Sequence, residues 1–231
     1  MGNGAIRFEL FGFPVSIHSS FILVIGLLGY SSARGDLAIV IAFVVAAIVA
    51  VLVHELGHAF AARSQGTEIG PMISLEGMAG LTRYRPSGPL SRGQSIFISA
   101  AGPLAGALLG VVVLAAAILG LFPDTNFAIT LRNIGLFVTF GWSILNLLPV
   151  LPLDGGHILT EVMPGSRMDR QRRAAAVSIV IAVAGAILVW WWLRDLFGVA
   201  ILSMLAFQNY SLLSASNRAR AVAPPTTPRI D

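Results

Sequence analysis

The chain has no cysteine and no lysine, and charged residues of either sign are scarce. Without cysteine there can be no disulfide framework and no thiolate nucleophile. Only 11% of the 231 residues are charged and 56% are hydrophobic, whereas a soluble domain carries about a quarter charged residues. The composition therefore excludes an ordinary soluble domain and predicts an all-α polytopic membrane protein.

The hydrophobic residues fall in long runs that predict about six transmembrane helices, because about 20 apolar residues cross a bilayer. We expect one integral-membrane domain over residues 1–213, with a core at 37–160 and with the first and the last two runs as peripheral helices. Residues 214–231 contain several prolines and arginines and are predicted to be a disordered cytoplasmic tail. The six runs cover residues 15–30, 37–62, 95–122, 127–148, 174–192 and 197–213.

The link between the second and third runs alternates weakly between apolar and polar residues and is interrupted by glycines. This pattern predicts two short strands, at 67–75 and 79–84, and a third strand could come from residues 6–11. We therefore expect a small membrane-associated β-sheet, with an ordinary interfacial loop as the alternative.

All fifteen basic residues are arginine, and their placement predicts the orientation of the chain. Twelve lie near the termini or in the two longer links, and only Arg34, Arg132 and Arg194 lie on the other side. By the positive-inside rule, both termini and both links are cytoplasmic. The arginines are dispersed, so the net charge of +4 indicates orientation in lipid and no nucleic-acid partner. The arginine-only set, with much alanine and glycine, is typical of a GC-rich bacterial genome and predicts a bacterial plasma (inner) membrane.

An ionisable cluster, His54-Glu55-Leu56-Gly57-His58, lies inside the second hydrophobic run. Histidines at i and i+4 share one face of a helix, with the spacing that binds one Zn²⁺, and the glutamate between them is placed to act as a general base. Ionisable side chains are costly in hydrocarbon, which favours a functional role. Accidental spacing would leave Glu55 buried with nothing to neutralise it.

A catalytic zinc usually takes three protein ligands, so a third ligand must come from another span. The fourth run crosses in the same direction as the second and ends in a proline- and glycine-rich segment that carries Asp154 and His157. Asp154 is favoured, because Zn²⁺ with two ionised carboxylates, those of Glu55 and Asp154, has no net charge. His157 and Glu161 remain alternatives as ligands.

With these pieces in place, the sequence resembles the site-2 protease family (peptidase family M50), which are intramembrane zinc metalloproteases. The resemblance implies one Zn²⁺ per chain, bound by His54, His58 and Asp154, with Glu55 as the base. It also implies a polar role for Asn146 near the substrate; Asn146 and His157 are both candidates for stabilising the oxyanion. The motifs that carry the resemblance are 54–58, 146–149 continuing into 152–156, 101–105 and 12–18.

The resemblance also implies the substrate, which is a membrane-anchored regulatory protein cut within or near its transmembrane segment. Expected partners are therefore a single-pass transmembrane protein and the lipid bilayer, while the oligomeric state is not indicated. The expected form is a minimal one, because no stretch is long enough for the PDZ or CBS domains of many relatives. One departure is Gly106, where the family often has asparagine. A non-catalytic zinc-binding scaffold or adaptor on the same fold, and less favourably a zinc transporter, are the rival functions.

Overall fold

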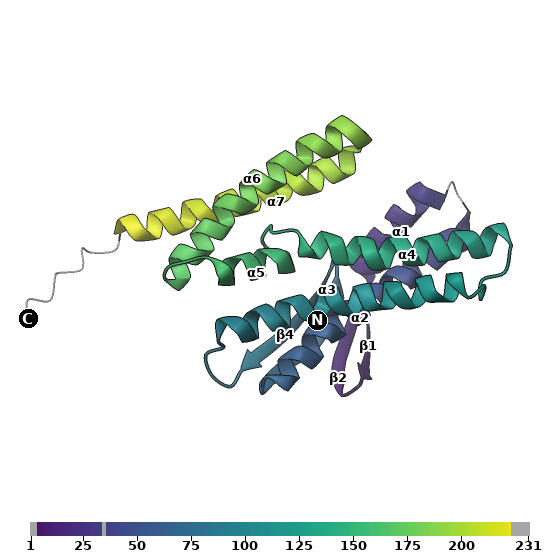
Figure 1. The fold of residues 1–231 in the computed structure, drawn as a ribbon, viewed down its shortest axis with the longest axis horizontal. Helices are drawn as coiled ribbons and strands as arrows, with labels where there is room; N and C mark the ends of the chain where they lie inside the picture. Colours follow the sequence, from purple (N-terminus) through teal and green to yellow (C-terminus); the bar gives the residue numbers. More distant parts are fainter. Residues whose placement is uncertain (1–3, 34–35, 223–231) are drawn as a thin grey trace, which may run out of the picture. The chain divides into compact units, whose positions relative to one another are not determined.

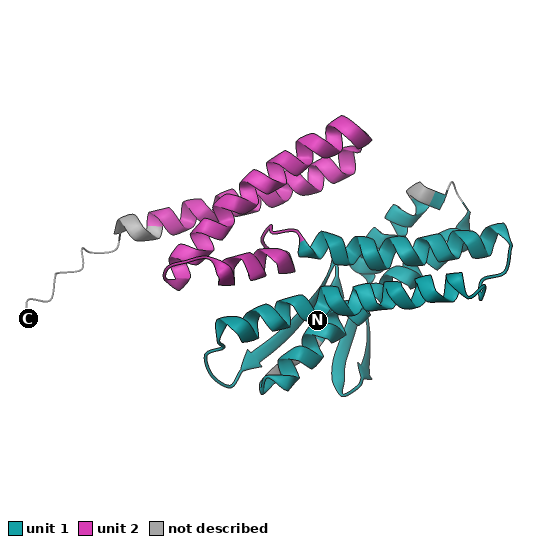
Figure 2. Cartoon of the chain, in the orientation of Figure 1, with its two compact units in different colours: residues 1–147 teal, residues 148–231 magenta. Residues whose placement is uncertain are grey.

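The computed structural model describes residues 4–33 and 36–222. The chain divides into two compact units, Met1–Leu147 and Leu148–Asp231, which are coloured separately in Figure 2. Within the described residues, the elements of the first unit are β1 (Ala5–Leu10), β2 (Phe13–His18), α1 (Ser19–Ala33), α2 (Leu37–Ser64), β3 (Thr67–Glu76), β4 (Ala79–Pro86), α3 (Arg92–Ile118) and α4 (Asn126–Leu147) (Figure 1). Those of the second unit are α5 (Asp154–Val162), α6 (Arg167–Leu193) and α7 (Leu196–Val222).

Five helices of the described residues, α2, α3, α4, α6 and α7, are long and apolar enough to cross a membrane. The predicted polytopic membrane protein with a small sheet is therefore confirmed. The first predicted span, 15–30, is the exception, because its start belongs to strand β2 and the following helix α1 has only 15 residues. At the α-helical rise, α1 is about 22 Å long, which is less than the roughly 30 Å hydrocarbon core.

The sheet has the strand order β1-β2-β3-β4. β2 is antiparallel to β1 and parallel to β3, and β4 is antiparallel to β3. The strands predicted at 6–11, 67–75 and 79–84 are confirmed as β1, β3 and β4, whereas β2 was not predicted. The apolar side chains of β2 and β3 pack with those of α1 and α2 in one hydrophobic core, which attaches the sheet to α2.

Arg63, near the end of α2, joins this helix to the turn between β1 and β2. Its guanidinium donates to the carbonyl oxygens of Phe11 and Gly12, both at 3.3 Å, and lies 3.6 Å from the centre of the Phe13 ring. The Phe60 ring packs edge-on against Phe13, with ring centres 5.1 Å apart. We call this group of residues the Arg63 clasp. It connects the β1–β2 hairpin to the helix that carries His54 and His58.

One side of α2 is buried from Ala47 to Ala62, mostly at positions separated by three or four residues. Such spacing places side chains on a single helical stripe. The stripe begins with small residues, which allow neighbouring helices to approach, and then continues into the ionisable cluster. Its members include Ala47, Ala50, Val51, His54, Glu55, His58, Ala61 and Ala62.

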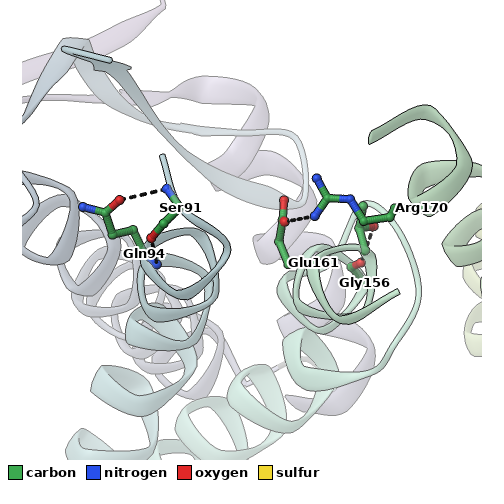
Figure 3. Close-up of polar contacts among 6 residues, drawn as sticks. Ser91, Gln94, Gly156, Glu161 and Arg170 are labelled. Carbon is green, nitrogen blue, oxygen red and sulfur yellow. Dashed lines mark hydrogen bonds and ion pairs between the residues drawn. The ribbon is translucent and has the colours of Figure 1, made fainter. Parts of the chain in front are cut away.

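The N-terminus of α3 is closed by a capping box, in which the Ser91 side chain accepts from Gln94 N and the Gln94 side chain accepts from Ser91 N (Figure 3).

Helices α3 and α4 pack closely through glycines of α3. Further along, a Cβ atom added at Gly106 would lie 2.5 Å from Ser143 Oγ on α4. A larger residue at position 106 would therefore require the Ser143 side chain to shift.

In the second unit, α6 and α7 lie side by side as an antiparallel pair (Figure 1). Val150, Ala182 and Leu205 form the buried centre of the unit. The short helix α5 was not predicted.

The tail predicted to be disordered from residue 214 is instead helical as far as Val222, because no proline occurs before Pro224 to break the helix. The rest of the predicted tail lies outside the described residues.

Candidate functional site

His54, Glu55 and His58 lie on the buried stripe of α2. Their exposed fractions are 2%, 4% and 9%. The Nε2 atoms of the two histidines are 3.1 Å apart, and the ring planes meet at 82°. The i, i+4 spacing therefore brings two imidazole nitrogens to a common point inside the first unit.

The orientation of the His58 ring is set by α3. His58 Nδ1 donates to the carbonyl oxygen of Ile98 at 2.7 Å. A carbonyl oxygen only accepts, so Nδ1 carries the proton and Nε2 keeps its lone pair. The close approach depends on Gly102, because a Cβ atom there would lie 2.2 Å from His58 Nε2. The glycine of the 101–105 motif thus makes room for the imidazole.

This histidine pair fits a zinc ion. Zinc–nitrogen bonds are about 2.0–2.1 Å long, which places two tetrahedral ligand atoms about 3.4 Å apart; the separation here is 3.1 Å. Metal-binding histidines usually donate the other ring N–H to a carbonyl or carboxylate, as His58 does to Ile98. The pair can therefore supply two of the three protein ligands of a catalytic zinc site.

Strand β4 holds the Glu55 side chain in place. Thr82 Oγ1 lies 2.7 Å from Glu55 Oε2 and 3.0 Å from the Glu55 main-chain oxygen, and its hydroxyl donates to them. Opposite the carboxylate the strand has Gly80, where a Cβ atom would lie 2.4 Å from Glu55 Oε1. The strand thus contacts the carboxylate with the Thr82 hydroxyl, and Gly80 leaves the space that the carboxylate occupies.

If Glu55 acts as the base of the peptide hydrolysis that the family resemblance implies, we expect Thr82→Val to lower the single-turnover rate by about tenfold or more. Hydrogen bonds to charged groups contribute about 1.5–3 kcal/mol, and each 1.36 kcal/mol of barrier is about a factor of ten in rate. Valine keeps the shape of threonine but cannot orient Glu55. The measurement is single-turnover cleavage in liposomes, with Thr82→Ser as the matched variant that keeps the hydroxyl. Equal rates for Thr82→Val and wild type would contradict a role for this contact.

β4 is an edge strand, because among the described residues its backbone pairs only with β3. Gly80, Thr82 and Tyr84 face inward and are partly buried, whereas Leu81 and Arg83 are exposed. Burial raises the pKa of the Tyr84 phenol above its ordinary value, so Tyr84 stays neutral at neutral pH. An edge strand presents unpaired backbone N–H and C=O groups to any extended segment that approaches it. Two residues of this strand, Gly80 and Thr82, lie against Glu55.

Asn146 is near the end of α4 in the first unit. Its Nδ2 donates to the Trp142 carbonyl oxygen, one turn earlier on the same helix, at 2.9 Å. The structure therefore shows a contact within the helix, and the role of Asn146 at the substrate or oxyanion stays a prediction.

The other predicted site residues belong to the second unit. Asp154 is the first residue of α5 and is half-buried, at the helix end that favours a negative charge. His157 lies in the first turn of α5 and is exposed. Glu161 forms an ion pair with Arg170 of α6 (Figure 3), so this alternative ligand is already engaged. The role of Asp154 as the third ligand stays a prediction.

The sequence did not reveal which residues outside α2 contact His58 and Glu55. Thr82 is a single threonine in a short strand, and nothing in its neighbours marks it as a partner of Glu55. Gly80 falls inside the predicted strand 79–84, and nothing local indicates that its value lies in the space it leaves for a distant side chain. Gly102 belongs to the 101–105 motif, but its contact with His58 depends on how α3 packs against α2.

Comparison with known proteins gives consistent matches to metallopeptidases. The family model described as Peptidase M50B-like matches residues 37–153, and that of Peptidase family M50 matches residues 122–190. A zinc metalloprotease of Methanocaldococcus jannaschii is 30% identical over 172 residues, covering 70% of this chain and 46% of that protein. A Synechocystis sp. protein, named as a candidate zinc metalloprotease, is 28% identical over 186 residues, covering 71% of this chain and 45% of that protein.

The chain thus spans about half the length of these two relatives. Among solved structures, the site-2 protease from Methanocaldococcus jannaschii matches with a TM-score of 0.63 and 24% identity, over 90% of this chain and 95% of that chain. At this level of identity, the likeness concerns the fold.

Proposed function

Because the chain belongs to the M50 peptidases of the site-2 protease family, we propose that it is an intramembrane zinc metalloprotease. Its substrates are membrane-anchored regulatory proteins, cut within or near their transmembrane segments. The observation that supports this best is the pair of imidazole Nε2 atoms 3.1 Å apart, with Glu55 held beside them by Thr82.

His54, His58 and Asp154 are the proposed ligands of one Zn²⁺ per chain. The two imidazoles are neutral ligands, so an aspartate as the third ligand and Glu55 as a second carboxylate balance the charge of the ion in a low-dielectric interior. When bound, the zinc ion acts as a Lewis acid that polarises the scissile carbonyl and makes water more acidic.

Glu55 is the general base of the proposed reaction. Its carboxylate accepts a proton from the attacking water as the new C–O bond forms, and later delivers that proton to the amine nitrogen as the peptide C–N bond breaks. Thr82 keeps one carboxylate oxygen, Oε2, in a fixed position. Asn146 and His157 are the proposed candidates for stabilising the oxyanion.

Strand β4 is the proposed docking edge for the substrate. The backbone of a transmembrane helix is hydrogen-bonded within itself, so the helix must unwind before a peptide bond can be attacked. An edge strand can pair with the unwound segment and hold it extended, and β4 has such an edge next to Glu55. The proposed substrate is therefore a single-pass protein whose span unwinds readily.

The proposed location is the inner membrane of a bacterium, with both termini and the opening of the site on the cytoplasmic side. This orientation is supported by the distribution of arginines under the positive-inside rule.

We expect the full chain, reconstituted in liposomes, to cut a single-pass model substrate inside its hydrophobic segment. Mass spectrometry of the products gives the new termini directly. A matched substrate, in which glycine and proline residues of the span are replaced by leucine, should be cut at least about tenfold more slowly, because a proline alone costs a helix interior about 3 kcal/mol. Cuts only outside the span would contradict the intramembrane proposal, and no cut of any substrate would favour the scaffold alternative.

A further inference from the structure

We propose that Ser178 of α6 and Asn209 of α7 are positioning residues for the segment that carries Asp154. This inference rests on the proposed function, in which Asp154 is a zinc ligand. It assigns a role to two buried polar side chains of the peripheral helices.

Both side chains bind the backbone of a single residue, Leu151. The Leu151 N–H donates to Ser178 Oγ at 3.0 Å, and Asn209 Nδ2 donates to the Leu151 carbonyl oxygen at 2.6 Å. Ser178 is 0% exposed and Asn209 is 2% exposed. One helix therefore satisfies the donor of Leu151 and the other helix satisfies its acceptor.

The orientation of the Asn209 amide follows from its surroundings. Nδ2 also donates to the Leu205 carbonyl oxygen at 2.8 Å, so this end of the amide faces two acceptors. A flipped amide would place its own oxygen against both carbonyls. A buried polar side chain is tolerated only when it is hydrogen-bonded, and here the Leu151 carbonyl provides one of the two acceptors. The Asn209 side chain therefore loses one of its two hydrogen bonds if the 150–156 segment moves.

The position of Leu151 determines the position of Asp154, because the short segment between them is tied to itself. Leu153 N donates to the Val150 carbonyl oxygen at 2.9 Å, and Gly156 N donates to the Leu153 carbonyl oxygen at 2.9 Å. The backbone of residues 150 and 151 lies directly on Gly156, where a Cβ atom would be 2.4 Å from Leu151 N. A shift of Leu151 would therefore move the first turn of α5, which begins with Asp154.

The role of these residues is to hold a backbone, and neither needs to touch the substrate or the metal. In metal sites, partners behind a ligand typically change metal affinity by about 10–100-fold when they are lost. We expect Asn209→Leu and Ser178→Ala each to weaken zinc binding by a factor in this range. The exchange of backbone hydrogens in residues 148–157 should also become at least about tenfold faster, because the Leu151 N–H and its neighbours lose their fixed partners.

The test uses the full chain in detergent micelles. Zinc affinity is measured by competition with a chelator, and hydrogen exchange is followed by mass spectrometry of peptides from 148–157, α6 and α7. Gln208→Leu is the matched control, because Gln208 is the exposed neighbour of Asn209, and it should behave as wild type. Ser178→Thr keeps the hydroxyl and should restore slow exchange. The expected result is faster exchange confined to 148–157, with α6 and α7 protected as in wild type.

Two outcomes would overturn the inference, and they are distinguishable. If the wild-type chain binds no zinc, the proposed function fails and this inference fails with it. If the wild-type chain binds zinc, and Asn209→Leu and Ser178→Ala bind it with unchanged affinity or exchange as wild type, the inference alone is wrong.

Discussion

Glu55→Gln is expected to lower the rate of peptide-bond cleavage by about 100- to 10,000-fold, the usual contribution of a positioned general base. Glutamine has nearly the shape of glutamate and can still contact Thr82, but it cannot take a proton from water. Because Glu55 is proposed as the base and not as a ligand, the zinc content of the variant should equal that of wild type. The measurement is single-turnover cleavage of a single-pass substrate in liposomes, with metal analysis of the same preparations.

The matched control is Glu9→Gln, which makes the same chemical change at an exposed position of β1. This control should cleave at the wild-type rate. If Glu55→Gln cleaved as fast as Glu9→Gln, Glu55 would not be the base. The scaffold alternative would then have to be reconsidered.

Asp154→Ala is expected to weaken zinc binding by at least about 100-fold. Loss of a group behind a ligand costs about 10–100-fold in metal affinity, so loss of a ligand itself should cost no less than the upper part of that range. Alanine removes the third donor and one of the two negative charges proposed to balance the ion. The measurement is a zinc titration against a chelator, followed by cleavage at saturating zinc.

Two further variants make this result specific. Asp124→Ala removes an exposed aspartate in the link between α3 and α4 and should leave zinc affinity unchanged. His157→Ala tests the competing ligand on the same short helix. If the affinity fell with His157→Ala and stayed at the wild-type value with Asp154→Ala, the third ligand would be His157.

The elements that sequence analysis predicted correctly are those fixed by local spacing. Histidines four residues apart on a helix share a face whatever the helix packs against, and the glycine-interrupted alternation of 67–84 forms strands β3 and β4. The apolar run predicts a helix over 15–30, yet residues 15–18 belong to β2, because a short apolar run does not distinguish a strand from a helix. β2 owes its conformation to pairing with β1 and β3.

The contacts that position the site were not accessible from the sequence, because they depend on tertiary packing. Nothing in the neighbouring sequence marks Thr82, Ser178 or Asn209 as a partner of a distant group, and a polar residue within a span can equally bond to its own helix, as Asn146 does. Asn209 carried the clearest signal, since an asparagine inside an apolar helix is costly without a partner. Its partner, a backbone carbonyl 58 residues earlier, became visible only in the folded chain.

The Arg63 clasp fixes the β1–β2 hairpin to the helix that carries the imidazoles. Arg63 follows His58 by five residues on α2 and holds the turn between β1 and β2 by two carbonyl oxygens and one aromatic ring. The β1–β2 turn and the imidazoles are therefore attached to one and the same helix.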